Sequence, residues 1–209
     1  MIYIQEKTLA EAWRCSLKEL HAKGAESQES EFYRFSHAVI EISNTDSSDT
    51  YDEHFPMSKN DVEIINNFLL TGENKEKVIH DWTKLYRERL FDEKYNQIEN
   101  LINYLTKKPG GKRAQASIWN QKVDLYGKIG PCLQLIWLQI IDSKLEMHIH
   151  MRATDCYGKL LMNMNEFIAL QNYIAKRLNV QSGTYIQFID SLHFNIGDKE
   201  KVGDILEKI

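Results

Sequence analysis

Cysteine and proline are scarce in this 209-residue sequence, which has three of each. The cysteines, Cys15, Cys132 and Cys156, are odd in number, and none of them forms a CxxC pair. A disulfide framework is built from paired cysteines, and a structural zinc site usually takes closely spaced ligand pairs. We therefore expect free thiols in a reducing compartment and no metal centre.

Long apolar runs and an excess of one charge are also absent. No segment approaches the ~20 apolar residues that cross a bilayer, and the first residues lack the basic and apolar stretches of a secretory signal. The formal net charge is only −4, with Lys and Arg interleaved among Asp and Glu, so the charge balance predicts no broad positive field for nucleic acid. The sequence predicts a cytoplasmic protein that binds neither membranes nor nucleic acid.

Hydrophobic residues make up 43% of the sequence and are spread along all of it, without an internal repeat or a low-complexity tract. A chain of this length can bury a substantial core as one unit. We therefore expect a single domain over residues 1–209.

The spacing of apolar residues predicts helices and strands. A spacing of three to four is typical of amphipathic helices and occurs at 8–23, 61–70, 75–90, 95–105 and 164–178. Short apolar or β-branched runs predict strands at 35–42, 114–119, 133–141, 145–151 and 184–194.

Three further segments complete the predicted fold. Residues 43–52 have the composition of a loop, Asp142-Ser143 fits a hairpin turn, and 198–209 is either a short helix or a surface end. The sum is an α+β fold of mixed α/β layers, with helices packed on a mostly continuous sheet.

Pro131-Cys132 stands just before the apolar strand, after the glycine-rich stretch 127–130. A thiol held there by a rigid proline could act as a nucleophile if a nearby cation lowers its pKa, and Arg113 and Arg152 are the candidates. The other interpretation is a structural cysteine in the core, because free cysteines are commonly buried.

Two short basic motifs could bind an anion. Arg152, three residues before Asp155, follows a strand, and the forked guanidinium can clamp a phosphate. An ion pair between Arg152 and Asp155 is the alternative. Lys112-Arg113, after two glycines, forms a second cluster, for which a solvated turn is the alternative.

Three polar residues in the last third of the sequence complete the set. His193 and Asn195 alternate along the final strand, so their side chains share one face. Asn163 precedes the predicted helix 164–178, where it either caps the helix or contacts a ligand.

In their order and separations these motifs resemble the thymidylate synthase family. The resemblance covers roughly half of the chain, from about Tyr86 to Asn195, and the short chain is similar to the compact archaeal-type members. It implies a thymidylate-synthase-type sheet with packed helices, a homodimer, 5,10-methylenetetrahydrofolate as cosubstrate and no metal. The substrate implied is a pyrimidine nucleoside monophosphate.

The resemblance gives the matched residues roles in the reaction. Cys132 would attack C6 of the pyrimidine, which makes C5 nucleophilic toward the one-carbon unit. Arg152 would bind the phosphate and keep the Cys132 thiol ionised, while Lys112 and Arg113 would reach the phosphate from the partner subunit. Tyr86 resembles the tyrosine that assists proton removal at C5.

Further roles concern the base and the sugar. Asp155 corresponds to the catalytic aspartate at the base and folate end, and Asn163 to the residue that reads the O4/N3 edge of the base. His193 corresponds to a sugar contact. The glutamate of an early helix has two candidates here, Glu63 first and Glu53 second.

The sequence departs from the family around phosphate and sugar. Lys112 replaces the second phosphate arginine, Ala153 replaces a serine, and Asn195 replaces a sugar-contacting tyrosine. The smaller Asn195 leaves room and a polar group for a 2′-hydroxyl. These changes favour hydroxymethylation of a cytidylate, CMP or dCMP, with water completing the C5 methylene, although Asn163 stands where cytosine-specific relatives often carry aspartate.

Two alternatives remain open. One is thymidylate synthase itself, which methylates dUMP to dTMP. The other is a non-catalytic nucleotide-binding relative, in which the altered phosphate residues and the unmatched glutamate mark a decayed site.

Overall fold

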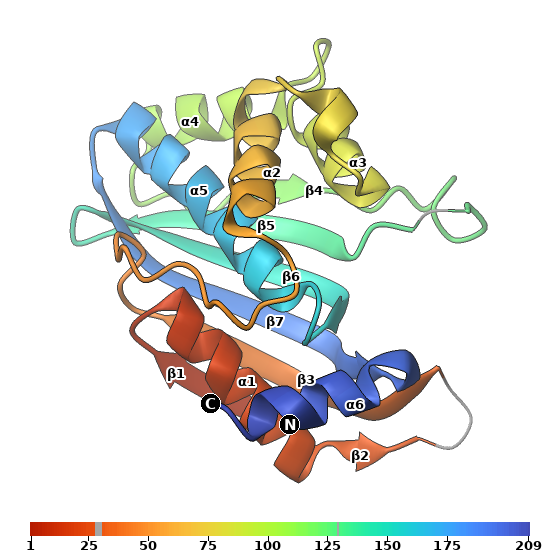
Figure 1. Cartoon of the computed structure of the whole chain (residues 1–209). Coiled ribbons are helices and arrows are strands. Elements are labelled where there is room, and N and C mark those ends of the chain that lie inside the picture. The colour runs from red at the N-terminus through yellow and green to blue at the C-terminus, as the bar shows by residue number, and fades with distance from the viewer. Residues whose placement is uncertain (28–30, 129) are drawn as a thin grey trace.

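The computed structural model describes residues 1–27, 31–128 and 130–209 (Figure 1). The predicted glycine-rich approach 127–130 includes residue 129, which lies outside this part of the chain. Within the described residues seven strands form one mixed sheet, in the order β1-β3-β7-β6-β5-β4, with β2 paired to β3. The strands are β1 Ile2–Glu6, β2 Ala25–Glu26, β3 Phe32–Ile42, β4 Ala114–Ser117, β5 Leu133–Ile141, β6 Lys144–Asp155 and β7 Gln181–Asn195.

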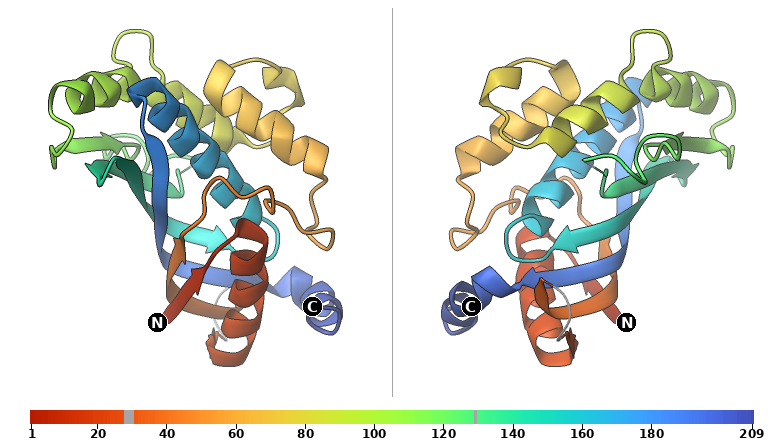
Figure 2. Two further views of the ribbon diagram at one scale, coloured as in Figure 1. Left: turned by 90° about the vertical axis from the view of Figure 1, so that its left-hand side faces the viewer. Right: turned by 90° about the vertical axis from the view of Figure 1, so that its right-hand side faces the viewer.

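Helices of the described residues pack mainly on one side of this sheet, as the edge-on views in Figure 2 show. The predicted α+β fold is therefore confirmed. The helices are α1 Leu9–Lys23, α2 Lys59–Thr71, α3 Asp81–Leu90, α4 Gln97–Lys107, α5 Leu160–Leu178 and α6 Lys199–Leu206, with short 3-10 helices η1 Lys75–Lys77 and η2 Ile196–Asp198. None of these helices is both long and apolar enough to cross a membrane.

The three central strands bring distant polar residues to one edge of the sheet. β5 and β6 form the predicted hairpin, in which Asp142 and Ser143 have φ values of 49° and 64°, as a type I′ turn requires. β6 then connects through α5 to β7, which runs parallel to it. The start of β5 and the ends of β6 and β7 consequently lie side by side at one end of the central strands. This end is the sheet edge at which the site lies.

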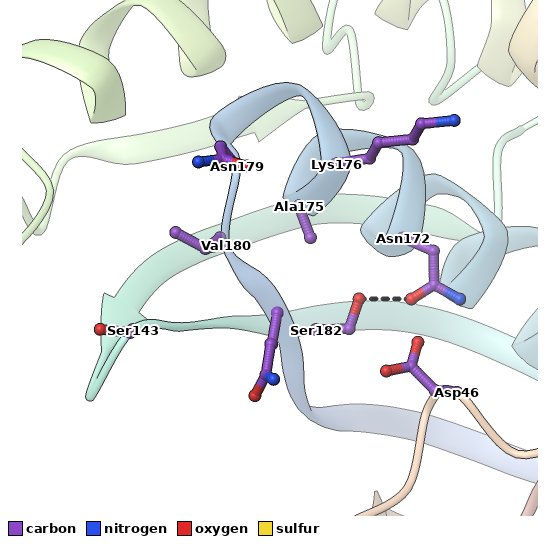
Figure 3. A pocket seen from close by; sticks show the side chains of 9 residues that line it. Asp46, Ser143, Asn172, Ala175, Lys176, Asn179, Val180 and Ser182 are labelled. Carbon is purple, nitrogen blue, oxygen red and sulfur yellow. Dashed lines mark hydrogen bonds between the residues drawn. The ribbon is translucent and has the colours of Figure 1, made fainter.

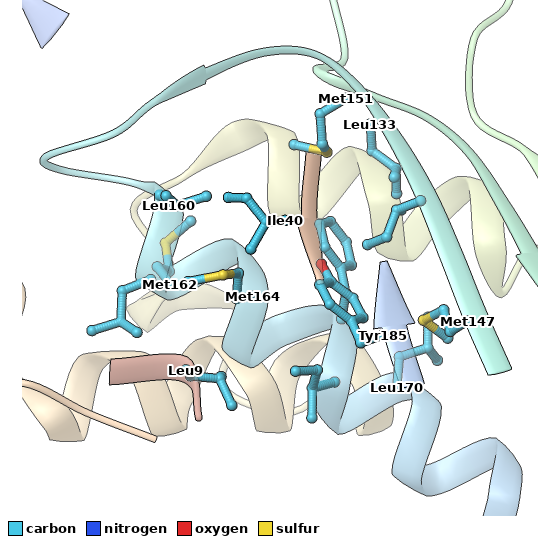
Figure 4. Packing of buried hydrophobic residues seen from close by; sticks show 14 of the residues in the cluster. Leu9, Ile40, Leu133, Met147, Met151, Leu160, Met162, Met164, Leu170 and Tyr185 are labelled. Atoms are coloured by element: carbon cyan, nitrogen blue, oxygen red, sulfur yellow. The ribbon is translucent and has the colours of Figure 1, made fainter. Parts of the chain in front are cut away.

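The core lies between the sheet and α5. Apolar side chains of α5 such as Met164 and Leu170 pack with Met147 and Tyr185 of the sheet and with Leu9 of α1, all fully buried (Figure 4). Because α5 contacts α1, α2 and α4 as well as the sheet, it is buried on most sides. Its first turn is thereby held rigidly beside the sheet edge described above.

Several predicted boundaries are wrong. The apolar pattern gives no prediction for β1, and the predicted helix 75–90 is interrupted between η1 and α3, where Ile79 and His80 are not helical. β6 continues to Asp155, beyond the predicted end of the strand, because its polar last residues still pair with β7. α5 begins at Leu160 rather than at residue 164.

Candidate active site

A cavity of about 250 Å³ opens at the sheet edge where β5 starts and β6 and β7 end. Six of the candidate site residues named from the sequence line it: Tyr86, Cys132, Asp155, Asn163, His193 and Asn195. Trp82, Ala153, Thr154 and Lys159 complete the lining. The structure thus brings together side chains from α3, β6, α5 and β7 around the thiol.

Cys132 is half-buried directly before β5 and is held by Arg152 of β6. The backbone N–H of Arg152 donates to the carbonyl oxygen of Cys132 at 2.8 Å, and Nη2 of Arg152 lies 3.9 Å from Sγ. Burial raises the pKa of the Cys132 thiol, and the Arg152 charge lowers it in part. In the unliganded protein desolvation outweighs the one cation that acts on the thiol, so the pKa of Cys132 lies above its usual value.

Tyr86 lies fully buried beside Cys132, and its hydroxyl oxygen accepts the N–H of Leu133 at 3.1 Å. Burial raises the pKa of the Tyr86 phenol, so the hydroxyl keeps its proton. The bond joins α3 to the start of β5. Tyr86 therefore places a hydroxyl at the cavity and fixes the strand that follows the thiol.

The loop before Cys132 is anchored by an ion pair between α3 and residue 124. The two terminal guanidinium nitrogens of Arg89 donate to the carboxylate of Asp124, at 2.6 and 2.7 Å. The same carboxylate accepts the backbone N–H of Asn120 at 2.6 Å. Arg89 holds the pKa of Asp124 below its usual range. A charge-assisted clamp of this kind restricts how far the loop can move from the cavity.

Asp155 ends β6 with its carboxyl at the cavity. Its Oδ1 accepts the backbone N–H groups of Tyr157 and Gly158, at 3.0 and 3.1 Å. A Cβ at position 158 would lie 2.7 Å from Oδ2, so glycine keeps that oxygen accessible. Burial raises the pKa of Asp155. Arg152 and Asp155 are both among the described residues and form no ion pair, since odd and even positions of a strand face opposite sides.

His193 pairs with Asp155 in the sheet register and stacks on Phe32, with ring centroids 3.9 Å apart. Its Nδ1 lies 3.0 Å from the carbonyl oxygen of Ser191. A carbonyl only accepts, so Nδ1 carries the proton and Nε2 is left as an acceptor. Burial lowers the pKa of His193, which favours this neutral form. Asn195 is half-buried two residues further along, and both lie on the cavity.

The structure does not bring every predicted residue to the cavity. Lys112 and Arg113 are exposed before β4, where the Lys112 carbonyl accepts the indole N–H of Trp137 at 3.1 Å. Glu63 on α2 and Glu53 before it are exposed and do not line the cavity. α2 turns Glu63 to solvent because the buried positions of this helix are apolar.

Asn163 is not a helix cap. It lies inside the first turn of α5, its backbone N–H donates to the Lys159 carbonyl at 2.9 Å, and its side chain is 4% exposed at the cavity. The capping interpretation is wrong because α5 begins at Leu160.

Sequence patterns missed Trp82 and Lys159. Nζ of Lys159 lies 3.2 Å from Nε2 of His80 and 5.6 Å from the centre of the Trp82 ring. Burial, followed by the Lys159 charge, lowers the pKa of His80 to about 4, so this imidazole is neutral near pH 7. The spacing could have indicated both residues. Trp82 lies four residues before Tyr86 and Lys159 four residues before Asn163, and residues four apart lie on the same side of a helix.

A neighbouring cavity of about 580 Å³ shares Asp155 and Lys159 with the first. Met57, Ile79 and Tyr157 give it apolar and aromatic walls. Asp155 and Lys159 therefore stand between two spaces of different size.

The more voluminous cavity at the other end of α5, about 730 Å³, has a different character (Figure 3). Ser182 donates to Oδ1 of Asn172 at 2.5 Å across it, and no cysteine or histidine is among its described lining residues. In the described part of the chain, no group of three or more His, Cys, Asp or Glu side chains could hold a metal ion. The cavity at Cys132 is therefore the candidate active site.

The α+β fold and the titratable groups around the Cys132 cavity define a small-molecule enzyme. Comparisons with known proteins place it more narrowly. The sequence matches the family described as "Thymidylate synthase" over residues 37–208. The chain therefore belongs to the thymidylate synthase family, whose members are one-carbon transferases.

Individual relatives agree with the family match. A protein of Methanocaldococcus jannaschii named "Putative thymidylate synthase" is 31% identical, with 94% of this chain and 91% of the relative covered. A protein of Methanosarcina acetivorans with the same name is 26% identical over 99% of this chain and 95% of the relative. A Listeria monocytogenes protein named "Thymidylate synthase" is 24% identical over 56% of this chain and 37% of the relative.

Proposed function

We propose that this enzyme transfers a one-carbon unit from 5,10-methylenetetrahydrofolate to C5 of a cytidylate, CMP or dCMP, and releases the 5-hydroxymethyl nucleotide. The observation that carries the proposal is that Cys132, Asn163, His193 and Asn195 line one cavity. This set supplies a thiol, a reader for the base and two polar groups for the sugar. Family membership supports the one-carbon chemistry, and Asn195 favours the ribonucleotide.

The thiol of Cys132 is the proposed nucleophile. Its sulfur adds to C6 of the pyrimidine once the proton has left, and the negative charge that develops at C5 and the C4 substituent needs stabilisation. Arg152, 3.9 Å from Sγ, favours the thiolate. The Tyr86 hydroxyl, buried at the same cavity, is the proposed group for removing the C5 proton through a bound water.

His193 and Asn195 are the proposed sugar contacts. With its Nδ1–H directed at the Ser191 carbonyl, His193 offers Nε2 to a ribose hydroxyl. The amide of Asn195 can donate and accept, which suits a second hydroxyl. Arg152 is the proposed phosphate ligand, and Ala153 beside it supplies no hydroxyl to share that task.

The neighbouring cavity at Asp155 is the proposed place of the folate. Its aromatic and apolar walls fit a flat ring, and Gly158 leaves Oδ2 of Asp155 open to accept hydrogen bonds from ring nitrogens. When bound there, the reduced folate supplies the one-carbon unit at the oxidation level of formaldehyde. Asp155 would orient that ring, and Lys159 would place a positive charge between the two ligands.

A homodimer is part of the proposal. On the side of the sheet away from α5, the ring of Trp137 lies 4.8 Å from that of His148, which lies 6.3 Å from Phe188. Phe188 is 42% exposed, an unusual position for a large apolar side chain on a central strand. A second copy would cover this aromatic row, and Lys112-Arg113, beside Trp137, would lie near the phosphate site of the partner.

The proposal is tested by incubating the protein with methylenetetrahydrofolate and each of CMP, dCMP, UMP and dUMP, each tritiated at C5. We expect tritium release from a cytidylate and a product that has gained one hydroxymethyl group. Exclusive turnover of dUMP would establish thymidylate synthase instead, an alternative that the Asn163 amide favours. Nucleotide binding without any tritium release would establish a non-catalytic binding protein. Cys132→Ser should abolish the release.

A further inference from the structure

Glu166 on α5 is a buried carboxyl that the proposed mechanism leaves unused. Its side chain is fully buried, and neither carboxyl oxygen has a hydrogen bond of good geometry. A buried polar group without a partner costs free energy, so such groups are few in native proteins. The burial of the Glu166 carboxyl must therefore be explained by the residues around it.

Two neighbours act on the carboxyl. Thr83 of α3 has a buried Oγ1 that also lacks a hydrogen-bond partner, and Asn163 stands one turn before Glu166 on the same face of α5. Interactions with Thr83 and Asn163 oppose the effect of burial, which raises the pKa of Glu166 to about 8. The carboxyl is thus mainly protonated near pH 7. A protonated carboxyl has an O–H that could donate to Thr83 Oγ1, which would give both orphaned groups a partner.

The remaining surroundings offer Glu166 no competing charge. Among the described residues Glu166 interacts with the phenols of Tyr86 and Tyr185, whose pKa values burial raises, and Tyr185 already donates its O–H to Gln187 at 2.7 Å. The buried residues of the helices packed against α5, namely α1, α2 and α4, include none with a charge. Asn163 is consequently the amide that the second carboxyl oxygen can bind.

We propose that Glu166 is a positioning residue that holds Nδ2 of Asn163 and so turns Oδ1 of Asn163 toward the base, which makes the cavity selective for a 4-aminopyrimidine. The second oxygen of Glu166 can only accept, whether the carboxyl is protonated at the other oxygen or ionised. It therefore selects the donor end of the Asn163 amide. The acceptor end is left for the amino group of cytosine.

This inference rests on the proposed function and removes its main difficulty. An asparagine amide can turn either end to a base and by itself does not separate cytosine from uracil. With Glu166 behind it, Asn163 presents a fixed acceptor in the manner of an aspartate. A 4-oxo base would then bring its O4 acceptor against the Asn163 oxygen and keep only N3–H to donate, so it gains a repulsive contact and loses a hydrogen bond.

The test measures binding of CMP and UMP to the whole protein by calorimetry, without turnover. Wild type should bind CMP more tightly than UMP, and Glu166→Met should reduce this ratio about tenfold because the amide is free to turn. Glu166→Gln, which keeps an acceptor for Asn163 and a donor for Thr83, should preserve the ratio. Thr83→Val is a milder variant that should reduce it partly.

Gln171→Met is the matched control, since Gln171 is equally buried on α5 but donates to backbone carbonyls of Leu145 and Gly183. It should lower stability and leave the CMP/UMP ratio unchanged. If Glu166→Met and Thr83→Val weaken both nucleotides equally, Glu166 is merely structural and the inference fails. If wild type itself prefers UMP, the proposed function fails, and the assigned amide orientation with it.

Discussion

Arg152 holds Cys132 twice, through a 2.8 Å hydrogen bond from its backbone N–H to the cysteine carbonyl and through a guanidinium 3.9 Å from Sγ. The first contact fixes where the sulfur lies, and the second partly opposes the rise in thiol pKa that burial causes. Position and charge of the thiol therefore depend on one residue of the neighbouring strand. Only the side-chain contact is lost on substitution.

Arg152→Gln should raise the pKa of Cys132 further, because the stabilising cation is removed while burial persists. Alkylation by iodoacetamide, which consumes thiolate, should then be at least about threefold slower at pH 8, with its midpoint at higher pH. The measurement needs a Cys15→Ser background, since Cys15 is partly accessible whereas Cys156 is fully buried. Arg177→Gln, at an exposed arginine that pairs with Glu99 and does not line the Cys132 cavity, is the control. Equal alkylation profiles for wild type and Arg152→Gln would contradict the role of the guanidinium.

The Arg89–Asp124 clamp should contribute to stability as well as to loop position. Asp124→Asn replaces a charge-assisted pair with a neutral contact and should lower the free energy of unfolding by about 1–2 kcal/mol at pH 7. The pKa of Asp124 is depressed in the folded protein. Its contribution is therefore present above the ordinary aspartate pKa of about 4 and is lost as the pH falls through the folded value.

Urea unfolding of wild type and Asp124→Asn at a series of pH values measures this contribution. The difference between them should shrink on acidification below about pH 4. Asp92→Asn is a suitable comparison. The Asp92 carboxylate is exposed, and it accepts the backbone N–H groups of Lys94 and Tyr95. A difference that stays constant down to low pH would show that the clamp acts through shape rather than charge.

Glu166 should make stability fall with rising pH. Burial raises its folded pKa to about 8, above the value of 4.5 for an unperturbed glutamate, so the folded state binds the proton more tightly than the unfolded state. The contribution is full below the unfolded pKa and is lost as the pH rises through 8. Glu166→Gln should therefore gain thermal stability relative to wild type between pH 6 and pH 9.

Thermal unfolding of both proteins across that pH range checks the expectation. Glu99→Gln is the control, because Glu99 is exposed and paired with Arg177, which lowers its pKa. Its offset from wild type should not change between pH 6 and 9. A constant offset for Glu166→Gln as well would mean that Glu166 is already ionised in the folded protein.

Asn195 should influence the choice of sugar. Asn195→Tyr fills the space beside His193 and removes an amide that can pair with a 2′-hydroxyl, so KM for CMP should rise about tenfold relative to KM for dCMP. Steady-state kinetics with the two nucleotides give this ratio. Asn195→Ser, which frees space, should keep the ribonucleotide. A preference unchanged by the tyrosine would place the sugar elsewhere in the cavity.

Part of the site could be predicted because its residues lie at the borders of apolar strands. Cys132, Arg152, Asp155 and His193 border apolar strands, and strand pairing carries such boundary positions to one sheet edge. Glu166 was not predictable in this way, because it sits within an apolar stretch where the hydrophobic pattern predicts only core. Its signal was the spacing itself, as Asn163 and Glu166 are two polar residues one turn apart on a buried helix face.

The fold boundaries that failed have similar causes. β1 pairs in parallel with β3 across a helix, so its five residues carry little local signal. The break before α3 places His80 against Lys159, a contact between segments 79 residues apart that no local pattern contains. By contrast, strands in which apolar and polar residues alternate were predictable. Burial of one face of the sheet requires that alternation.

The proposed shared site predicts complementation between two defective subunits. Cys132→Ser lacks the thiol, and Lys112→Glu/Arg113→Glu lacks the cations proposed to reach the partner's phosphate. A mixed dimer combines the intact Cys132 of one subunit with the intact basic pair of the other. Mixing the two inactive proteins in equal amounts, with subunit exchange, should therefore restore activity at about one site in four.

Phe188→Asp provides the matching control, because a charge in the exposed aromatic row should prevent association. Light scattering should show this variant as a monomer, and adding the substitution to both defective proteins should abolish complementation. Tyr3→Asp, at an exposed residue on the edge strand β1, should leave the dimer intact, since β1 lies farther along the sheet from Trp137. Failure of the two proteins to complement while wild type is dimeric would mean that each subunit binds phosphate with Arg152 and its own residues alone.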